Sequence, residues 1–218
     1  MLSITVDPLA NTLSITPDVR RDINIIRDGG TELKFSCGVG GNFRDEDVVK
    51  ILNDDDVNPD RITKITLAYC SSITDKALIA IADTCHNLTW LEIGVCENIT
   101  GAGIDAIARQ CRKLDFLWAY SCNISHLPED IGMLLPHLKT LALQKNKIKK
   151  IPASLGPLAD TITIFNISFN PLQQPPLEIA NKGLHAIQRY YDEPDVRQES
   201  TRILNTYEYC TCSPFNFK

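Results

Sequence analysis

The sequence predicts an α/β solenoid, in which one strand-and-return unit repeats along an axis and stacks its strands into a curved parallel sheet. The first observation is a fixed period, because five similar units recur after 26, 26, 24 and 24 residues. They begin at Ile62, Leu88, Leu114, Leu138 and Ile162. The second observation is alternation: two apolar residues flank one variable position in each unit, as in a short strand with one buried face.

The composition fits one folded domain with a tail. Of 218 residues, 44% are hydrophobic and 22% are charged, which is enough to build a core. The formal net charge is −5, so no overall positive field attracts nucleic acid or an anionic membrane. No apolar run approaches the ~18 residues of a membrane span, and residues 1–10 lack the features of a secretory signal. We therefore expect no nucleic-acid or membrane partner. The start at Met1 and the C-terminal tail favour a complete chain, monomeric on its own, and a recognition fragment of a longer enzyme stays open as an alternative.

Residues 1–30 are predicted to form an N-terminal cap over the exposed first repeat. The same tetrapeptide occurs at Leu2–Thr5 and Leu13–Thr16, which favours a β-hairpin. A helix is then expected to start at Thr16-Pro17-Asp18 and to end at Gly29-Gly30.

Residues 31–172 are predicted to hold about six repeats, because a weaker copy around Leu33 and Phe35 precedes the five clear ones. In the first two clear copies, Thr74 and Thr100 open returns with the apolar period of a helix. The returns of the next two copies, which begin Leu-Pro and Ile-Pro, are shorter and predict turns or short helices.

The end of the repeats is predicted at Pro175-Pro176. A C-terminal cap over 173–193 should contain one helix from Leu177 to Tyr191, and the tail over 194–218 a further short helix from Val196 to Asn205. The inner side of the cap helix is predicted to carry Ile179, Leu184, Ile187 and Tyr191.

The five units match the pattern L-x-x-L-x-L-x-x-N/C-x-L, so residues 31–193 resemble the leucine-rich-repeat superfamily. The resemblance implies a horseshoe with a concave parallel sheet. The first clear copies resemble the cysteine-containing type of ubiquitin-ligase substrate receptors, through Cys70-Ser71-Ser72-Ile73-Thr74-Asp75 and Cys85. The later copies are similar to the short type with Leu-Pro-x-x-Ile.

The segment from Asn170 to Tyr190 resembles the cap that ends repeat arrays in proteins that sometimes carry a GTPase domain. Mixed repeats in a short chain are also similar to leucine-rich-repeat effectors of intracellular bacteria. That resemblance implies delivery to the host cytosol and a regulator that inhibits or recruits a partner enzyme. An adaptor of a ubiquitin-ligase-like assembly stays open as an alternative.

Most of the eight cysteines are explained by the repeat. Cys70, Cys96 and Cys122 occupy one repeat position, and Cys85 and Cys111 occupy another. We expect buried ladders of free thiols, which favour a reducing, cytoplasmic location. The close pair Cys210 and Cys212 has no second pair to complete a zinc site, and it leaves a thiol-dependent enzyme as a further alternative.

No other motif indicates catalysis, a metal or a cofactor. The acidic run from Asp54 to Asp60 lacks the Gly and Glu of a calcium loop, and Gly38–Gly41 lacks the Lys and Ser/Thr of a phosphate loop. The four histidines fall on or near return segments and form no nucleophile–base set. We therefore predict a binding protein and not an enzyme.

Strand alternation predicts the binding face. If Leu91 and Ile93 point inward, Trp90 and Glu92 point into the hollow of the sheet, and so do three aromatic residues of the next unit. A shift of register by one residue would bury these rings instead. The predicted partner-binding residues are Trp90, Glu92, Phe116, Trp118, Tyr120, Tyr69, Lys64, Gln144, Lys145 and Phe169. The basic fourth unit, with Lys145 and Lys147, is either a solvated rim or a contact for an acidic partner surface.

Overall fold

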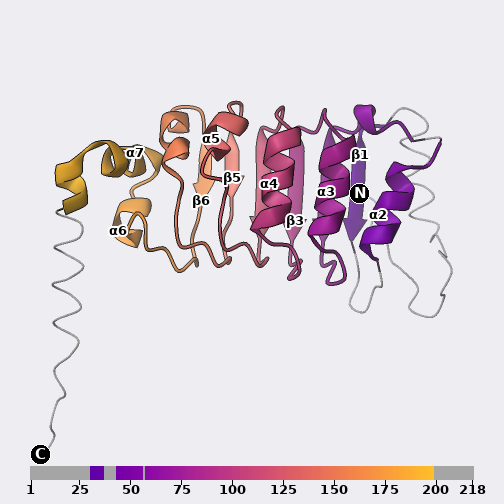
Figure 1. Cartoon of the computed structure of the whole chain (residues 1–218), viewed down its shortest axis with the longest axis horizontal. Coiled ribbons are helices and arrows are strands. Elements are labelled where there is room, and N and C mark those ends of the chain that lie inside the picture. The colour runs from indigo at the N-terminus through magenta and orange to yellow at the C-terminus, as the bar shows by residue number, and fades with distance from the viewer. Residues whose placement is uncertain (1–29, 37–42, 56, 199–218) are drawn as a thin grey trace, which may run out of the picture.

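In the part of the chain that the structure describes, six parallel strands stack in chain order into one sheet, with the returning segments on one side of it (Figure 1). The structure is a computed structural model and describes residues 30–36, 43–55 and 57–198. The strands are β1 (Glu32–Ser36), β2 (Lys64–Ala68), β3 (Trp90–Gly94), β4 (Phe116–Tyr120), β5 (Thr140–Ala142) and β6 (Ile164–Asn166). They confirm the predicted strands and the predicted stacking, including the weak first copy. All but one residue of the predicted N-terminal cap, and the Cys210/Cys212 pair, lie outside the described residues.

The returns change type along the chain, as the sequence predicts. Helices α2 (Asp45–Leu52), α3 (Asp75–Thr84) and α4 (Gly101–Gln110) lie side by side in front of the first strands (Figure 1). The later returns are the short helix α5 (Ile131–Leu134) and the 3₁₀ helix η2 (Ala153–Leu158); a further 3₁₀ turn, η1 (Pro59–Arg61), precedes β2. None of the helices in the described ranges is both long and apolar enough to cross a bilayer.

The core lies between the sheet and the returns. The register pairs Leu91 with Ile65 on one side and with Leu117 on the other, so each inward residue stacks on its counterpart in the next repeat. These three side chains are fully buried. Burial of one such side chain contributes about 1.5–3 kcal/mol, which makes the continuous apolar column the main source of stability.

Side-chain hydrogen bonds join neighbouring helix starts. The backbone N–H and hydroxyl of Thr74 donate to Asp45 at 2.8 and 2.7 Å, and those of Thr100 donate to Asp75 at 2.8 and 2.6 Å. The series ends at Gly101, where a Cβ would lie 2.6 Å from the carbonyl oxygen of His126. Glycine is therefore required at the point where long repeats give way to short ones.

A second ladder runs along the ends of the strands. The buried thiols of Cys70 and Cys122 donate to the carbonyl two residues earlier, at 3.3 and 3.4 Å. In the short repeats an asparagine takes this position. The Asn146 amide donates to Ala119 O at 2.7 Å, and its oxygen accepts from the N–H of Ile124 at 3.2 Å. Asparagine thus accepts a hydrogen bond from the backbone N–H of Ile124 as well as donating to a carbonyl, whereas the thiols of Cys70 and Cys122 donate to a carbonyl.

The single helix predicted over 177–191 is wrong. The structure has α6 (Leu177–Ala180) and α7 (Leu184–Asp192), because Gly183 at φ 87° interrupts the helical backbone. In α7, Tyr190 is buried, whereas Tyr191 is half-buried and donates its hydroxyl to Ile151 O at 2.6 Å. Further helical residues, 194–198, follow at the end of the described part. The division into cap and tail stays a prediction.

Candidate functional site

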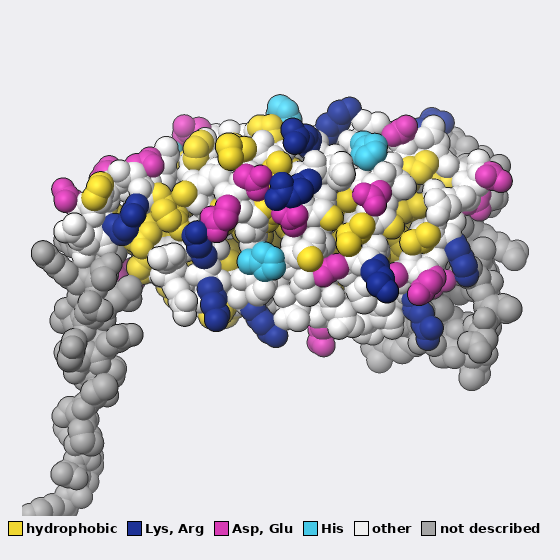
Figure 2. All heavy atoms as spheres, in the orientation of Figure 1, with side chains coloured by type: hydrophobic (Ala, Val, Ile, Leu, Met, Phe, Trp, Pro, Cys, Tyr) yellow, Lys and Arg dark blue, Asp and Glu magenta, His cyan; other side chains and the backbone are white. Residues whose placement is uncertain are grey.

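The side chains of the strands alternate between the core and the opposite face. Leu91 and Ile93 are fully buried in the core, whereas Trp90 and Glu92 between them are half-buried and point away from the helices. The register predicted from the repeat is therefore correct. The helix-covered side carries intermixed acidic and basic side chains (Figure 2), as a solvated surface does.

Four rings form an aromatic cluster on the helix-free face: Trp90, Phe116, Trp118 and Tyr120. The rings of Trp90 and Phe116, on neighbouring strands, stack with centroids 3.4 Å apart and an angle of 7° between their planes. The centroids of Phe116 and Trp118 are 6.1 Å apart, and those of Trp118 and Tyr120 are 5.8 Å apart. The cluster is continuous from β3 to the end of β4 and is separate from the core.

Charged and polar neighbours hold both ends of the cluster. The Lys64 ammonium lies 4.7 Å from the Trp90 ring centroid and 3.1 Å from Glu32. At the other end the Tyr120 ring lies over Gly94, where a Cβ would be only 2.5 Å from the ring. Burial, together with the neighbouring Tyr69 phenol, raises the pKa of Tyr120.

Three polar atoms on the outward-facing side chains have no hydrogen-bond partner. They are the indole nitrogens of Trp90 and Trp118 and the side-chain oxygen of Gln144, and each is buried among the described residues. A buried polar atom left unpaired costs about 1–3 kcal/mol.

The predicted residues at the strand ends share one backbone conformation that the sequence did not reveal. Tyr69, Lys145 and Phe169 have φ of 57°, and the equivalent Val95 and Ser121 have φ of 55° and 51°. Each such residue costs about 1–2 kcal/mol outside glycine. The N–H of Lys145 compensates by donating to Ser168 O at 2.9 Å in the next repeat. Phe169 is 77% exposed and lies two strands beyond the aromatic cluster, so the structure does not join it to the rings.

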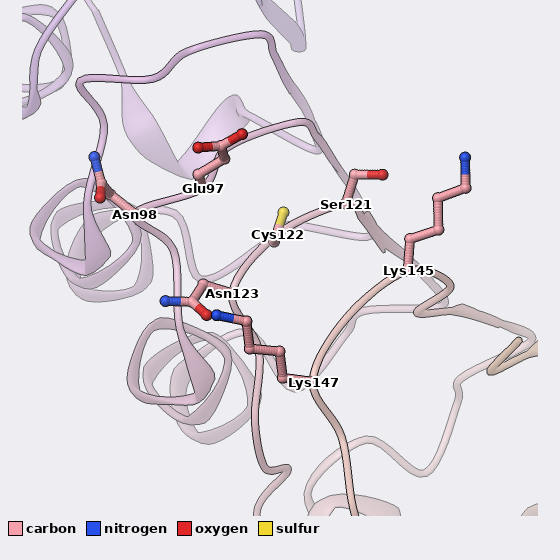
Figure 3. A pocket seen from close by; sticks show the side chains of 7 residues that line it. All are labelled: Glu97, Asn98, Ser121, Cys122, Asn123, Lys145 and Lys147. Carbon is pink, nitrogen blue, oxygen red and sulfur yellow. The ribbon is translucent and has the colours of Figure 1, made fainter. Parts of the chain in front are cut away.

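A cavity of about 450 Å³ opens at the ends of β3, β4 and β5 (Figure 3). It is lined by Glu97, Asn98, Ser121, Cys122, Asn123, Lys145 and Lys147. Sequence reasoning missed it, although the signal is present: the turn from Cys96 to Ile99 is one residue longer than that from Cys122 to Ile124. We call it the strand-end pocket.

The described cysteines are poor nucleophiles. All five are buried. Burial raises the pKa of Cys85 to about 11 and those of Cys111 and Cys122 to about 12, so these thiols stay protonated at neutral pH. Within the described ranges, no three His, Cys, Asp or Glu side chains come together as a metal site.

No protein-family model matches the chain, and no curated protein matches its sequence. Among solved structures, it is similar to an internalin from Listeria monocytogenes, with 25% identity over 64% of this chain and 36% of the internalin, at a TM-score of 0.48. It is also similar to the plant peptide hormone receptor RGFR1 in complex with RGF2, with 18% identity over 64% of this chain and 19% of the receptor, at a TM-score of 0.42. The chain therefore spans well under half the length of either. Its own repeat pattern and ordered parallel sheet make the fold an α/β solenoid.

Proposed function

We propose that this chain is a protein-recognition module that binds a partner protein on the helix-free face of its sheet and catalyses no reaction. The observation that carries the proposal is the aromatic cluster, which places both tryptophans of the chain outside the core on one continuous face. Tryptophan and tyrosine are the residues that most often dominate the binding energy of protein interfaces.

The physical state of the face supports this role. Its rings are held by a hydrogen-bonded sheet, so binding would order little that is not already ordered. Because Trp90 and Phe116 stack on each other, the cluster offers less area than four separate rings, and neighbouring polar residues must complete an interface of ~800 Å² per partner. The proposed contact residues are Lys64, Tyr69, Trp90, Glu92, Phe116, Trp118, Tyr120, Gln144, Lys145 and Phe169.

We propose a partner enzyme that the module inhibits or recruits, in a reducing compartment such as the cytoplasm. The buried, protonated thiols support such a compartment. They also weigh against the thiol-dependent enzyme as far as the described cysteines are concerned. Delivery as a bacterial effector, or use as a ubiquitin-ligase-like adaptor, rests on the sequence resemblance.

Affinity capture with three forms of the chain tests the proposal. Wild type and Met133→Ala should retain one partner, whereas the double variant Trp90→Ala/Trp118→Ala should lose it, as read by mass spectrometry. Met133 is a matched apolar control, because it is 73% exposed on α5. The captured partner is then purified and titrated, and its affinity for the folded double variant should fall at least tenfold. Unchanged affinity would contradict the proposal.

A further inference from the structure

We propose that the strand-end pocket anchors an acidic side chain of the partner, so that the recognised element is a short extended segment with an Asp or Glu at one end. The inference rests on the proposed function, because the same segment would cover the aromatic cluster. It adds a direction, a length and a charge to the partner.

The direction follows from strand β4. Phe116, Trp118 and Tyr120 alternate along this strand, and Ser121, the next residue, lines the pocket. The aromatic cluster therefore leads into the pocket without a break in the chain. From Phe116 to Tyr120 the strand advances about 13 Å, at ~3.3 Å per residue. An extended segment of about six residues, ~20 Å long, would cover the rings and reach into the pocket.

The pocket exists because the repeat changes type. The turn after Cys96 contains one extra residue, Asn98, which together with Glu97 forms one side of the pocket. The turn after Cys122 is one residue shorter and carries the small Ser121 and Asn123. In the next repeat, the long side chains of Lys145 and Lys147 form another side of the pocket. Identical repeats would have turns of equal length, and we would expect no such pocket between them.

The charge of the pocket favours an anion. Lys145 and Lys147 have no ion pair within the described part of the chain, although Lys139 and Lys150 of the same region pair with Asp115 and Glu129. The pocket is lined by two cations and one carboxylate, that of Glu97, in a chain whose formal net charge is −5. Figure 3 shows the Lys147 side chain extended toward Asn123, and that of Lys145 extended past Ser121. The site is therefore locally opposite in sign to the protein as a whole.

Hydrogen bonds fix the backbone of both lysines, Lys145 and Lys147. The N–H of Lys145 donates to Ser168 O at 2.9 Å, and that of Lys147 donates to Ile124 O at 2.8 Å. Asn146 between them is buried and hydrogen-bonded to Ala119 O and Leu143 O. Only the flexible ends of the lysines have to order around a carboxylate, which lowers the entropic cost of binding it.

A random twelve-residue peptide library, displayed on phage and selected on the full chain, tests the proposal. Enriched peptides should carry an Asp or Glu about five residues from an apolar end. Synthetic copies are then titrated by fluorescence anisotropy. We expect Lys145→Ala and Lys147→Ala each to weaken binding about three- to fivefold, as for a solvent-accessible ion pair. Glu97→Gln should strengthen it, and the affinity should fall as salt is added.

Lys50→Ala on α2 is the matched control, because Lys50 is exposed in the last turn of the return after β1, away from the β3–β5 end of the sheet, and its loss changes the net charge equally. Peptides that lose affinity with Trp118→Ala but keep it with both lysine variants would overturn the anchor and leave the proposed function intact. Peptides insensitive to both sets of variants would contradict the proposed function itself. Failure to enrich any peptide would overturn the short segment, and competition by inorganic phosphate against acid-free peptides would assign the pocket to a free anion.

Discussion

The stacked pair Trp90 and Phe116 decides whether variants of the aromatic cluster can be interpreted as binding variants. Their rings lie 3.4 Å apart and nearly parallel, outside the core. We predict that Trp90→Ala, Phe116→Ala and the double variant all fold, and that the two single losses of stability do not add. The pair therefore tests the cluster without any knowledge of the partner.

The magnitude follows from burial and contact. Both rings are half-buried, so each single variant should lose about 1–3 kcal/mol, below the ~3–5 kcal/mol of a fully buried aromatic residue. The stack itself should appear as a coupling free energy of about 0.5–1.5 kcal/mol. For a chain of this size a loss of 1 kcal/mol lowers the melting temperature by about 2–4 °C. Alanine at Trp90 should therefore lower the melting temperature moderately.

The measurement is urea unfolding at 25 °C followed by far-ultraviolet circular dichroism, because removal of a tryptophan confounds fluorescence. Wild type, both single variants and the double variant form a double-mutant cycle. Met133→Ala, on the helix side, should change stability by less than ~0.5 kcal/mol. A coupling below ~0.3 kcal/mol would refute the stack, and a single loss above ~4 kcal/mol would show that the rings belong to the core.

Further predictions concern the asparagine ladder, Gly94 under the Tyr120 ring and the buried thiols. Asn146→Ala should lose about 1–3 kcal/mol, because the buried N–H of Ile124 loses its acceptor. Asn146→Cys should lose less, because a thiol at this position can still donate to a carbonyl, as that of Cys122 does, although the Ile124 N–H stays unpaired; equal losses in urea unfolding would contradict the ladder. Gly94→Ala should displace the Tyr120 ring, lose about 1–3 kcal/mol and return the pKa of Tyr120 toward its ordinary value, as measured by phenolate absorbance against Tyr120→Phe. The described thiols should resist a thiol reagent at pH 8. Rapid labelling in the folded state would show that the thiols are accessible. Burial raises the pKa of Cys85 from 9.0 to about 11 in the folded chain, so the unfolded chain loses this proton at a lower pH. The contribution of this thiol to the free energy of unfolding should therefore be complete below about pH 9 and decline above it.

The sequence was sufficient for the parts of the fold that repeat. One apolar column needs the same residue type at the same phase in every unit, so the period located all six strands and the register of Trp90 against Phe116. The helix starts at Thr74 and Thr100 were equally visible, because an N-cap hydroxyl followed by an apolar helical period is a local signal.

What the sequence did not predict depends on differences between neighbouring units. The break between α6 and α7 needs the positive φ of Gly183, which a search for helical period passes over. The left-handed residues before the Cys/Asn ladder are not glycines, and those from Tyr69 to Lys145 each donate a hydrogen bond to the next repeat, which no single unit contains. Likewise, the strand-end pocket follows from the different lengths and side chains of three adjacent turns.

The aromatic cluster and the strand-end pocket meet where the long repeats become short. Up to β3 each unit is joined to the next by threonine and aspartate at the helix starts, and at Gly101 this series ends against His126. At the same strand ends the shortened turn after Cys122 opens the pocket, at the residue that follows Tyr120. The change of repeat type therefore ends one inter-repeat hydrogen-bond series and creates one recess, and the asparagine ladder begins in the next repeat at Asn146. The junction can therefore carry an irregular surface without a gap in the core, and this is the physical reason to expect recognition there and not at the regular ends of the sheet.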